Sequence, residues 1–572
     1  MNKSYCKLFL LVLFLVIFLS GNIPVKAEET IRPEVRALWV DAFRDGFKTP
    51  AQVDKLIQDS VTANINTLIV QVRRRGDAYY NNTIEPRTED PALLPGFDAL
   101  QYLIDQAHAK NIEVHAWLNT LVAWNSTTPP ADPNHVWNLH GPNAIGEANW
   151  VSYYRTYDKR KHRWSDNLCS SFFLDPGNPD ALDYTTDVYL SVVKNYNIDG
   201  IHLDYSRYAG SAWGYNPTNV ARYNARYGAT GLPGPDDPRW AEWRREQTAN
   251  LVRKIYLKSI AVKPNIKVSS AVITWGEGPV AESDWLKSRA YCEVFQDWHS
   301  WLQEGILDIA IPMNYFCGWK SNEQLWYNQW IEWEKNHQYG RQIVIGPGIF
   351  SQYIEDSLEQ IRRAQGPSAL GNYSAGVCLF TYGAAHLYSS EDYKEPASHK
   401  KLPRQPYQFI PEAQDWFYPL LSKEGGYTDP ALKTYISTQP VFPAPAPIPD
   451  MPWKSQPETG YLTGSIVDST GKKFDHYKVM VDGPLLPSPE PSNIKIIGTH
   501  RELYTDGSGW FGLTQLPPGN YRVAITAEDF SGNKLFKVRV QAGLVTVVNF
   551  EEVHEQESQV DNNPDLKESV GE

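Results

Sequence analysis

Patterns that bind metals, nucleotides or cofactors are missing from this sequence. Five cysteines occur in 572 residues, and the four beyond Cys6 show no Cys-x-x-Cys spacing, which argues against a zinc ribbon or a thioredoxin-like site. No His-Glu-x-x-His motif, paired-histidine motif or Asp-rich calcium loop is present. No glycine-rich phosphate-binding motif follows a predicted strand, and the Gly-x-Ser-x-Gly motif is absent. We therefore expect no metal and no cofactor.

Positive charge is also scarce. Lys and Arg together number 54 against 66 Asp and Glu, so the formal net charge is −12. A chain with this balance is a poor candidate for binding nucleic acid or anionic lipid through bulk charge. The last 22 residues, 551–572, hold eight acidic residues and one Lys. We expect the stretch 553–572 to be an acidic, disordered tail.

Long apolar runs are limited to the N-terminus. Residues 8–19 are twelve apolar residues in a row, preceded by Lys3 and Lys7, and Val25-Lys26-Ala27 is an acceptable cleavage site. This pattern predicts a signal peptide over 1–27 and a secreted protein, whether periplasmic, envelope-bound or extracellular. The alternative is an uncleaved anchor, but twelve residues are short for a membrane span of about 20. We expect no membrane span after cleavage.

Short apolar runs rich in β-branched residues alternate with longer amphipathic segments from about residue 34. The eight runs are 35–41, 65–73, 112–119, 200–205, 267–275, 308–315, 342–350 and 375–382. Near-continuous hydrophobicity is typical of strands buried on both faces of a parallel sheet. Helices are predicted between them, one opening at Thr49 and Pro50 and others at 97–110, 240–262 and 354–364. The pattern favours an α/β fold, a (β/α)8 TIM barrel over 31–435, rather than a doubly wound open sheet.

The composition changes after the barrel. Residues 436–458 include the segment PVFPAPAPIPDMP, which predicts a stiff, proline-rich linker. Residues 459–552 alternate apolar and polar residues and contain turn motifs such as DGSG and PPGN. This second pattern predicts a small all-β sandwich.

Aromatic residues are abundant, at 13% of the chain with 20 Trp and 33 Tyr, and suit flat ligands such as sugar rings. In a TIM barrel, functional side chains project from the C-terminal ends of the strands. The fourth run ends in Asp204, Tyr205, Arg207 and Tyr208. An arginine can hold a carboxylate in its ionised form, and phenols can donate hydrogen bonds to it. Asp204 is therefore the first candidate catalytic carboxylate, with a structural ion pair to Arg207 as the alternative.

Cleavage of a glycosidic bond usually needs two carboxyl groups. Glu277, just past the fifth run and beside two glycines, ranks first for the second role, and Asp41, at the end of the first run, ranks second. Further candidates to bind sugar hydroxyls or stack on sugar rings are Arg73, His115, Trp117, Asn119, Tyr205, Arg207, Tyr208, Trp275, Asn314, Tyr315 and Tyr382. Ordinary core packing is the alternative for each Trp and for His115.

Several segments resemble the glycosyl hydrolase-like 10 family. They are EVRALWV at 34–40, QVR at 71–73 with GDA at 76–78, HAWLN at 115–119, DGIHLDYSRY at 199–208 and PMNY at 312–315. The resemblance spans about 31–390 and implies a TIM barrel in secreted or envelope proteins. Some members are implicated in cleaving peptidoglycan glycan strands stripped of their peptides. At the C-terminal end, GSIVD at 464–468 and LPPGNY at 516–521 resemble a carboxypeptidase regulatory-like sandwich, which is usually non-catalytic.

The leading hypothesis is a secreted glycoside hydrolase that uses carboxylate acid/base chemistry on a polysaccharide or glycan strand. Denuded peptidoglycan is one candidate substrate. A protein that only binds glycans on a degenerate barrel is the alternative, and a lyase or transglycosylase is a third. Two carboxyl groups at about 5 to 9.5 Å would favour hydrolysis, because catalytic pairs lie at such separations.

Overall fold

The computed structural model describes residues 31–158, 163–167, 171–385, 411–429, 433–468, 470–485, 500–526, 530, 532 and 534–551. The predicted signal peptide at 1–27, the tail at 553–572 and Cys169 lie outside these residues. Within them, eight parallel strands close into a barrel in the order β1-β12-β11-β10-β9-β8-β3-β2. The TIM barrel predicted from the sequence is confirmed, and the open-sheet alternative is excluded because the sheet closes on itself.

All eight predicted runs contain a barrel strand. The strands are β1 (Val35–Val40), β2 (Thr67–Arg73), β3 (Glu113–Asn119), β8 (Gly200–Asp204), β9 (Lys267–Val272), β10 (Ile309–Asn314), β11 (Gln342–Pro347) and β12 (Gly376–Phe380). Nearly every residue in them is buried, as expected for strands covered on both faces.

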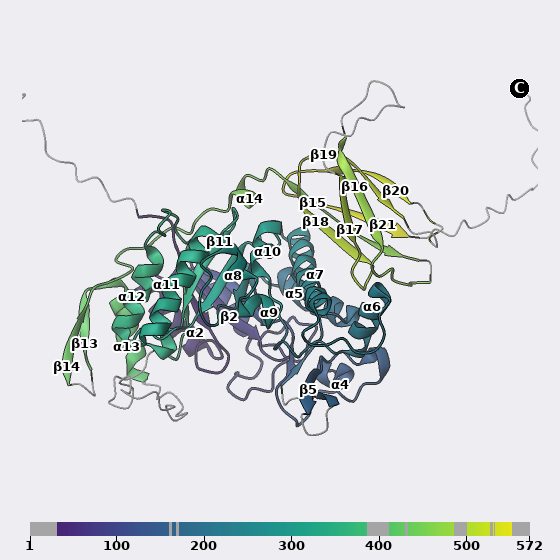
Figure 1. Cartoon of the computed structure of the whole chain (residues 1–572). Helices are drawn as coiled ribbons and strands as arrows, with labels where there is room; N and C mark the ends of the chain where they lie inside the picture. Colours follow the sequence, from purple (N-terminus) through teal and green to yellow (C-terminus); the bar gives the residue numbers. More distant parts are fainter. Residues whose placement is uncertain are drawn as a thin grey trace, which may run out of the picture.

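Helices follow the strands and surround the barrel (Figure 1). The main ones are α2 (Pro50–Thr62), α3 (Ala99–His108), α5 (Pro179–Asn195), α7 (Pro238–Val262), α10 (Trp298–Glu304), α11 (Ser321–Asn336), α12 (Ile354–Gln365) and α13 (Pro411–Ser422). Thr49 caps α2 as predicted, since its side chain accepts a hydrogen bond from the Gln52 N–H and Pro50 occupies the first turn.

A long insertion separates β3 from α5. It contains the pair β4 (Val122–Trp124) and β7 (Phe172–Phe173), the helix α4 (Val136–His140), and the hairpin of β5 (Tyr154–Asp158) and β6 (Arg163–Asn167). Because the insertion leaves the C-terminal end of a barrel strand, it lies beside the face where barrel active sites form. The helix α6 (Pro217–Tyr227), after β8, contacts the short helix η1 (Gly146–Ala148) of this insertion.

The proline-rich segment crosses the opposite, N-terminal end of the barrel. Its backbone accepts hydrogen bonds from the Glu34 N–H at Pro447 and from the Gln342 side chain at Asp450, at 2.8 and 2.9 Å. The buried Met451 joins the apolar core inside the barrel, and α14 (Pro452–Ser455) follows it. The segment predicted as a spacer therefore also covers the bottom of the barrel.

The C-terminal part is all β. One sheet has the order β18-β15-β21 and the other β17-β16-β19-β20. The strands are β15 (Gly460–Val467), β16 (Lys478–Leu485), β17 (His500–Tyr504), β18 (Trp510–Leu516), β19 (Gly519–Ile525), β20 (Leu535–Val540) and β21 (Val545–Glu551). Both sheets contribute to one apolar core, which includes Leu462, Val481, Phe511 and Val523. The resemblance to a carboxypeptidase regulatory-like module stays a prediction.

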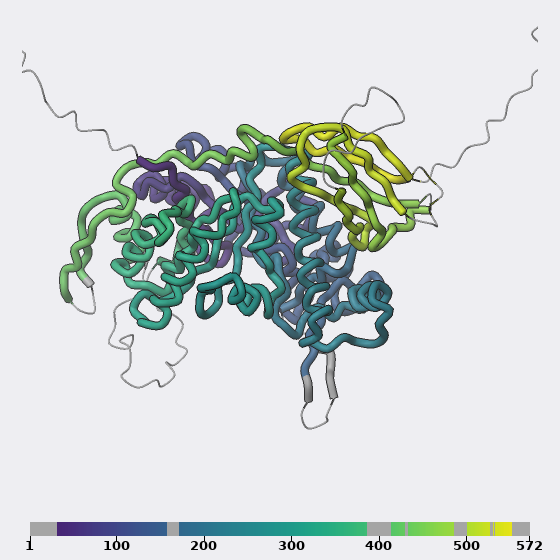
Figure 2. The backbone as a smooth tube through the Cα atoms, turned by 45° about the horizontal axis from the view of Figure 1, so that its top comes forward, coloured from purple at the N-terminus to yellow at the C-terminus, as the bar shows by residue number. Residues whose placement is uncertain are grey.

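The all-β part lies against α5, α6 and α7 of the barrel (Figures 1 and 2). Lys254 of α7 is buried between the two parts, with its Nζ 3.1 Å from Asp506 Oδ2 and 2.6 Å from Ser508 Oγ. Arg222 of α6 forms a two-point ion pair with Asp475, at 2.7 and 2.9 Å. Two-point pairs of this kind fix orientation as well as distance. The hairpin of β13 (Gly425–Asp429) and β14 (Thr434–Thr438) lies on the other side of the barrel.

Candidate active site

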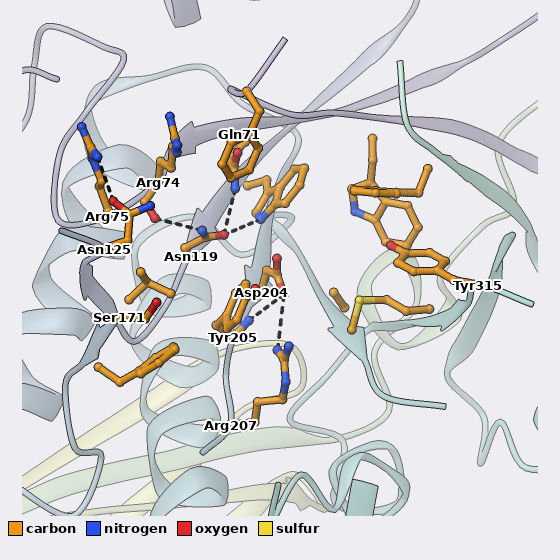
Figure 3. Close-up of a pocket in the computed structure, with 18 residues that line it drawn as sticks. Gln71, Arg74, Arg75, Asn119, Asn125, Ser171, Asp204, Tyr205, Arg207 and Tyr315 are labelled. Carbon is orange, nitrogen blue, oxygen red and sulfur yellow. Dashed lines mark hydrogen bonds and ion pairs between the residues drawn. The ribbon is translucent and has the colours of Figure 1, made fainter. Parts of the chain in front are cut away.

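A cleft of about 270 Å³ opens at the C-terminal ends of the barrel strands (Figure 3). Seven of the eight barrel strands, or the loops directly after them, contribute to its lining. The lining residues are Trp39, Phe43, Gln71, Arg74, Arg75, Trp117, Asn119, Val122, Asn125, Ser171, Phe173, Asp204, Tyr205, Arg207, Ala271, Met313, Tyr315 and Phe380. Among the sequence candidates, the structure brings Trp117, Asn119, Asp204, Tyr205, Arg207 and Tyr315 together here.

Asp204, the last residue of β8, is the one carboxylate among the described residues that line the cleft. It is 7% exposed. Its Oδ1 accepts a hydrogen bond from the Tyr205 N–H at 2.7 Å and lies 3.5 Å from Arg207 Nη1. Burial raises the pKa of Asp204 above its ordinary value, although the Arg207 charge and the Tyr205 N–H oppose that rise. A carboxyl in this environment keeps its proton to higher pH than a solvated one.

Tyr205 and Arg207 are arranged around that carboxyl. Tyr205 has φ +53°, in the left-handed region that non-glycine residues rarely occupy. This backbone conformation costs about 1–2 kcal/mol and is typical of sites where the chain must turn sharply to present a side chain. The Arg207 guanidinium lies 4.3 Å from the Tyr205 ring centre, so the phenol ring holds the cation beside Asp204.

A hydrogen-bond network holds one wall of the cleft. Asn119 Oδ1 accepts from Gln71 Nε2 at 3.0 Å and from the Trp117 indole at 3.1 Å. The Nδ2 of Asn119 donates to the Arg74 carbonyl at 2.9 Å. Asn119 is therefore occupied by protein groups, and its effect on a ligand is to orient Gln71, Trp117 and Arg74 rather than to contact sugar directly.

Aromatic side chains form the floor and the far wall. The Trp39 indole donates to His202 Nε2 at 3.0 Å, and His202 Nδ1 lies 2.9 Å from Ser269 Oγ, which fixes the orientation of Trp39. Burial lowers the pKa of His202 well below its ordinary value, so this histidine is neutral and structural. Tyr315 stacks on Phe380 with ring centres 4.9 Å apart. These flat apolar faces are suited to sugar rings.

Arg74 and Arg75 form the end of the cleft opposite Tyr315, together with Asn125 (Figure 3). Arg74 and Arg75 were not among the predicted site residues, because they follow the last residue of β2, Arg73. The run Arg73-Arg74-Arg75 was a visible pattern that could have indicated them. Phe43 and Phe173 also line the cleft without having been selected as site residues, whereas Gln71, which ends the second predicted strand, was expected there.

Neither candidate for the second carboxylate lines the cleft. Glu277 is exposed and accepts a hydrogen bond from Gln329 Nε2 at 3.2 Å. The strand β9 ends at Val272, three residues earlier than predicted, so Glu277 and Trp275 lie out in the following loop. Trp275 is 36% exposed and packs beside Arg289 instead of facing the cleft.

Asp41 directly follows β1 but is occupied by its own loop. Its Oδ1 accepts from the Phe43 N–H at 2.9 Å, and its Oδ2 binds Arg44 Nη1 at 2.6 Å and the Thr381 hydroxyl at 3.0 Å. Asp41 is 1% exposed. These contacts position the loop that carries Phe43, so the structure supports a structural role for Asp41 more than a catalytic one.

The remaining candidates point away from the cleft. A bulge in β2 between Gln71 and Arg73 turns the Arg73 side chain outward, where it forms a buried two-point ion pair with Glu85 at 2.7 Å. His115 lies inside the barrel near Glu113, with 3.4 Å between Nε2 and Oε2. Tyr208, Asn314 and Tyr382 bind Asp175, Glu334 and Asp59, at 3.2, 2.9 and 2.9 Å.

Over the described residues, no group of three or more His, Cys, Asp or Glu side chains is arranged to hold a metal ion. Over the same residues, no helix combines the length and the apolarity that a bilayer span requires.

Comparison with known proteins identifies the family. A model of the family described as glycosyl hydrolase-like 10 matches residues 34–362, which is more than half of the chain. The chain belongs to this family. Membership agrees with the resemblance noted in the sequence, and the matched residues include every barrel strand from β1 to β11.

Two curated relatives are similar over part of their length. The glycosyl hydrolase YngK of Bacillus subtilis is 27% identical over 372 residues, which are 61% of this chain and 68% of YngK. The glycosyl hydrolase DigH of Escherichia coli is 30% identical over 280 residues, or 46% of this chain and 58% of DigH. The chain thus spans little more than half of DigH.

Solved structures also resemble the barrel. The glycoside hydrolase domain of PgaB (BpsB) from Bordetella bronchiseptica is 16% identical, with a TM-score of 0.44, over 61% of this chain and 94% of that domain.

Proposed function

We propose that this member of the glycosyl hydrolase-like 10 family is a secreted glycoside hydrolase that cleaves a cell-envelope or extracellular polysaccharide. The observation that supports this most is Asp204, a buried carboxyl with a raised pKa in an aromatic cleft at the C-terminal face of the barrel. Denuded peptidoglycan glycan strands are the first substrate to test. Secretion rests on the predicted signal peptide at 1–27.

Asp204 is suited to act as the general acid. It would transfer its proton to the glycosidic oxygen while the bond from that oxygen to the anomeric carbon breaks. The Arg207 guanidinium, beside Oδ1, would then stabilise the carboxylate that forms. Water adds to the anomeric carbon, and its second proton restores the acid. Because the acid form is required, activity falls as pH rises through the raised pKa of Asp204.

The second group of the reaction has to be found outside the described lining of the cleft. A sugar that carries a 2-acetamido group would supply it, because the acetamido carbonyl oxygen can attack the anomeric carbon as the glycosidic bond breaks, as in substrate-assisted glycosidases. Water then displaces the acetamido oxygen from the anomeric carbon and gives the hydrolysed sugar. Peptidoglycan strands contain such sugars. On this reading the product keeps the configuration of the bond that is broken.

The same observation favours a second candidate function. One carboxylate in the described lining is also what a protein that binds glycans without cleaving them would have. Arg207 and Tyr205 would then serve only to hold Asp204 as a hydrogen-bond acceptor for a sugar hydroxyl. A lyase is distinguished from both by anhydro or unsaturated ends in its products.

The experiment is to incubate the protein without residues 1–27 with denuded peptidoglycan and a panel of polysaccharides. Products are identified by mass spectrometry. We expect hydrolysed, reducing-end products from the wild type and from Glu277→Gln, which removes an exposed carboxyl outside the cleft. Asp204→Asn should release products about 10² to 10⁴-fold more slowly. Binding without release of products by the wild type would favour the glycan-binding function, and full activity of Asp204→Asn would exclude Asp204 as the acid.

A further inference from the structure

Three consecutive arginines, Arg73 to Arg75, stand at the end of β2. Nearby carboxylates compensate their positive charges to different degrees. Arg73 is buried in a two-point ion pair with Glu85. Arg75 Nε lies 3.6 Å from Asp77 Oδ2, a longer and weaker pair. Arg74 makes no ion pair with any carboxylate in the described part of the chain. Compensation of charge thus declines from the residue behind the cleft wall to the residues that line the cleft.

Arg74 and Arg75 are nevertheless held in place. The Arg74 guanidinium lies 4.0 Å from the ring centre of Phe43, and the Arg75 guanidinium lies 4.0 Å from that of Trp124. Arg75 Nη1 also donates to Asn125 Oδ1 at 2.8 Å. In both residues the Nε atom is buried without a hydrogen-bond partner among the described residues. Stacking on a ring occupies the face of a guanidinium and leaves for a ligand those edge donors that protein groups do not already bind, as Asn125 binds Nη1 of Arg75.

The charge of the cleft is opposite to that of the chain. Its described lining holds three guanidinium groups, on Arg74, Arg75 and Arg207, and one carboxylate, on Asp204. The whole chain has a formal charge of −12. Arg207 is beside Asp204, whereas Arg74 and Arg75 lie with Asn125 at the other end (Figure 3). Two cations that are rigid and poorly compensated at one end of a cleft favour an anionic ligand there.

We propose that the arginine end, formed by Arg74, Arg75 and Asn125, binds a carboxylate carried by a sugar unit of the glycan. This inference rests on the proposed function and names the chemistry of its substrate. A guanidinium fork matches the two oxygens of a carboxylate, and the rings of Phe43 and Trp124 exclude water from one face of each cation. Placed away from Asp204, the carboxylate would be bound without being the group that reacts.

Two kinds of glycan carry this group. A uronic acid has a carboxylate on the sugar ring. The lactyl group of peptidoglycan has a free carboxylate only after its peptide is removed, because the peptide is attached there as an amide. An arginine end that binds the free carboxylate would therefore favour stripped strands over intact ones.

The test measures binding, so that it does not depend on cleavage. Asp204→Asn protein is titrated calorimetrically with denuded peptidoglycan oligomers, with the same oligomers after reduction of each carboxyl to an alcohol, and with oligogalacturonate. We expect the denuded oligomer to bind about tenfold or more tightly than its reduced form, the difference that corresponds to about 1.4 kcal/mol. If oligogalacturonate also binds tightly, any sugar carboxylate suffices. If it does not, the group that the arginine end binds is the lactyl carboxylate.

Substitutions test whether Arg74 and Arg75 cause the preference for the denuded oligomer over its reduced form. Adding Arg74→Gln and Arg75→Gln should bring the ratio of the two affinities close to one, whereas Arg74→Lys with Arg75→Lys should keep part of it. Arg239→Gln is the matched control, since Arg239 is an exposed arginine at the start of α7. Thermal unfolding of each variant verifies that it is folded.

The outcomes separate this inference from the proposed function. Equal binding of the denuded and reduced oligomers, or an unchanged preference in the double Gln variant, would overturn the arginine end even if the wild type cleaves glycans. A preference that is lost in the double Gln variant supports it even if the wild type cleaves none.

Discussion

Each end of the barrel buries one aspartate, but the two carboxylates differ in how many cations and hydrogen-bond donors surround them. At the bottom, Asp308 is fully buried and is bound by two cations, Lys454 Nζ at 3.0 Å and Arg341 Nη1 at 3.4 Å. It also accepts hydrogen bonds from Tyr256, Trp453 and the Val268 N–H, at 3.1, 2.7 and 2.9 Å. At the top, Asp204 has one cation at 3.5 Å and one short hydrogen bond from a backbone N–H.

This difference indicates that Asp308 stabilises the fold, whereas Asp204 is available for a reaction. We call the first a structural acid for this reason. Every oxygen of Asp308 is satisfied by groups that belong to the barrel or to the segment that covers it. Asp204 is buried almost as deeply but is less well compensated, which is why its pKa is raised. Buried groups that lack full compensation destabilise a fold, so they are kept mainly where they have a function.

The largest effect that we expect is the loss of activity on changing Asp204 to Asn. Removing a general acid lowers the rate by about 10² to 10⁴-fold. The free energy of unfolding should change by less than about 1 kcal/mol, because Asn can keep the hydrogen bond from Tyr205 and no strong ion pair is lost. Steady-state kinetics on a substrate that the wild type cleaves and chemical denaturation measure the two quantities. A large loss of stability would mean that Asp204 is as structural as Asp308.

The corresponding change at the bottom, Asp308→Asn, should have the reverse effect. It leaves Lys454 and Arg341 buried without an anion, and removing one partner of a buried pair costs about 3–5 kcal/mol. Denaturant unfolding of the variant measures this loss. The rate per folded molecule should remain near that of the wild type. If Asp308→Asn were as stable as the wild type, the cations and hydrogen bonds around Asp308 would not be what gives it a structural role.

A third buried acid, Glu334, also lacks a compensating cation in a close ion pair among the described residues. It contacts Asn314 at the end of β10. Glu334 of α11 is fully buried and accepts a hydrogen bond from Asn314 Nδ2 at 2.9 Å. Burial raises its pKa to about 8. Its Oε1 and the Asn314 Oδ1 are both buried without a partner among the described residues. A proton on Oε1 would satisfy both, as in a carboxylic acid paired with an amide.

The folded protein therefore holds this proton up to about pH 8, whereas the unfolded chain releases it near pH 4.5. Its stabilising contribution is complete below pH 4.5 and is lost as pH rises through 8, by about 1.4 kcal/mol per pH unit at most. Denaturant unfolding between pH 5 and pH 8 measures the slope. In Glu334→Gln, which imitates the protonated form, the slope should be smaller. An identical slope in both proteins would show that Glu334 is ionised when folded.

The smallest effect concerns one hydrogen bond to Asp308. Trp453→Phe keeps an aromatic ring under the barrel and removes the indole N–H that donates to Asp308 Oδ1. We expect the free energy of unfolding to fall by about 1.5–3 kcal/mol, or by about 1 kcal/mol if a water molecule replaces the indole donor. Differential scanning calorimetry of the two proteins measures it. An unchanged melting temperature would mean that the two cations alone compensate Asp308.

The barrel could be predicted because its evidence is local. Each strand of a TIM barrel is buried on both faces, so each appears in the sequence as a short apolar run such as 342–350. The end of a run then marks the C-terminal face, and this rule selected Asp204, Tyr205, Arg207, Trp117 and Tyr315, all of which line the cleft.

The rule failed where a side chain's direction depends on the third dimension. Arg73 ends β2, but a bulge turns it outward to Glu85. Asn314 ends β10 with its side chain toward α11, because successive residues of a strand alternate between the two faces. Arg74 and Arg75 belong to a loop, and no periodic pattern predicts which way a loop residue points.

The sequence by itself determined the fold class, the order of the strands along the chain and the strand end that carries Asp204. These features depend on hydrophobic patterns that act over a few residues. Only the tertiary structure decided which carboxylates are satisfied by other groups, which arginines face the cleft and what the proline-rich segment covers. Those properties depend on contacts between residues far apart in the chain, such as Asp308 with Lys454, and no local pattern encodes them.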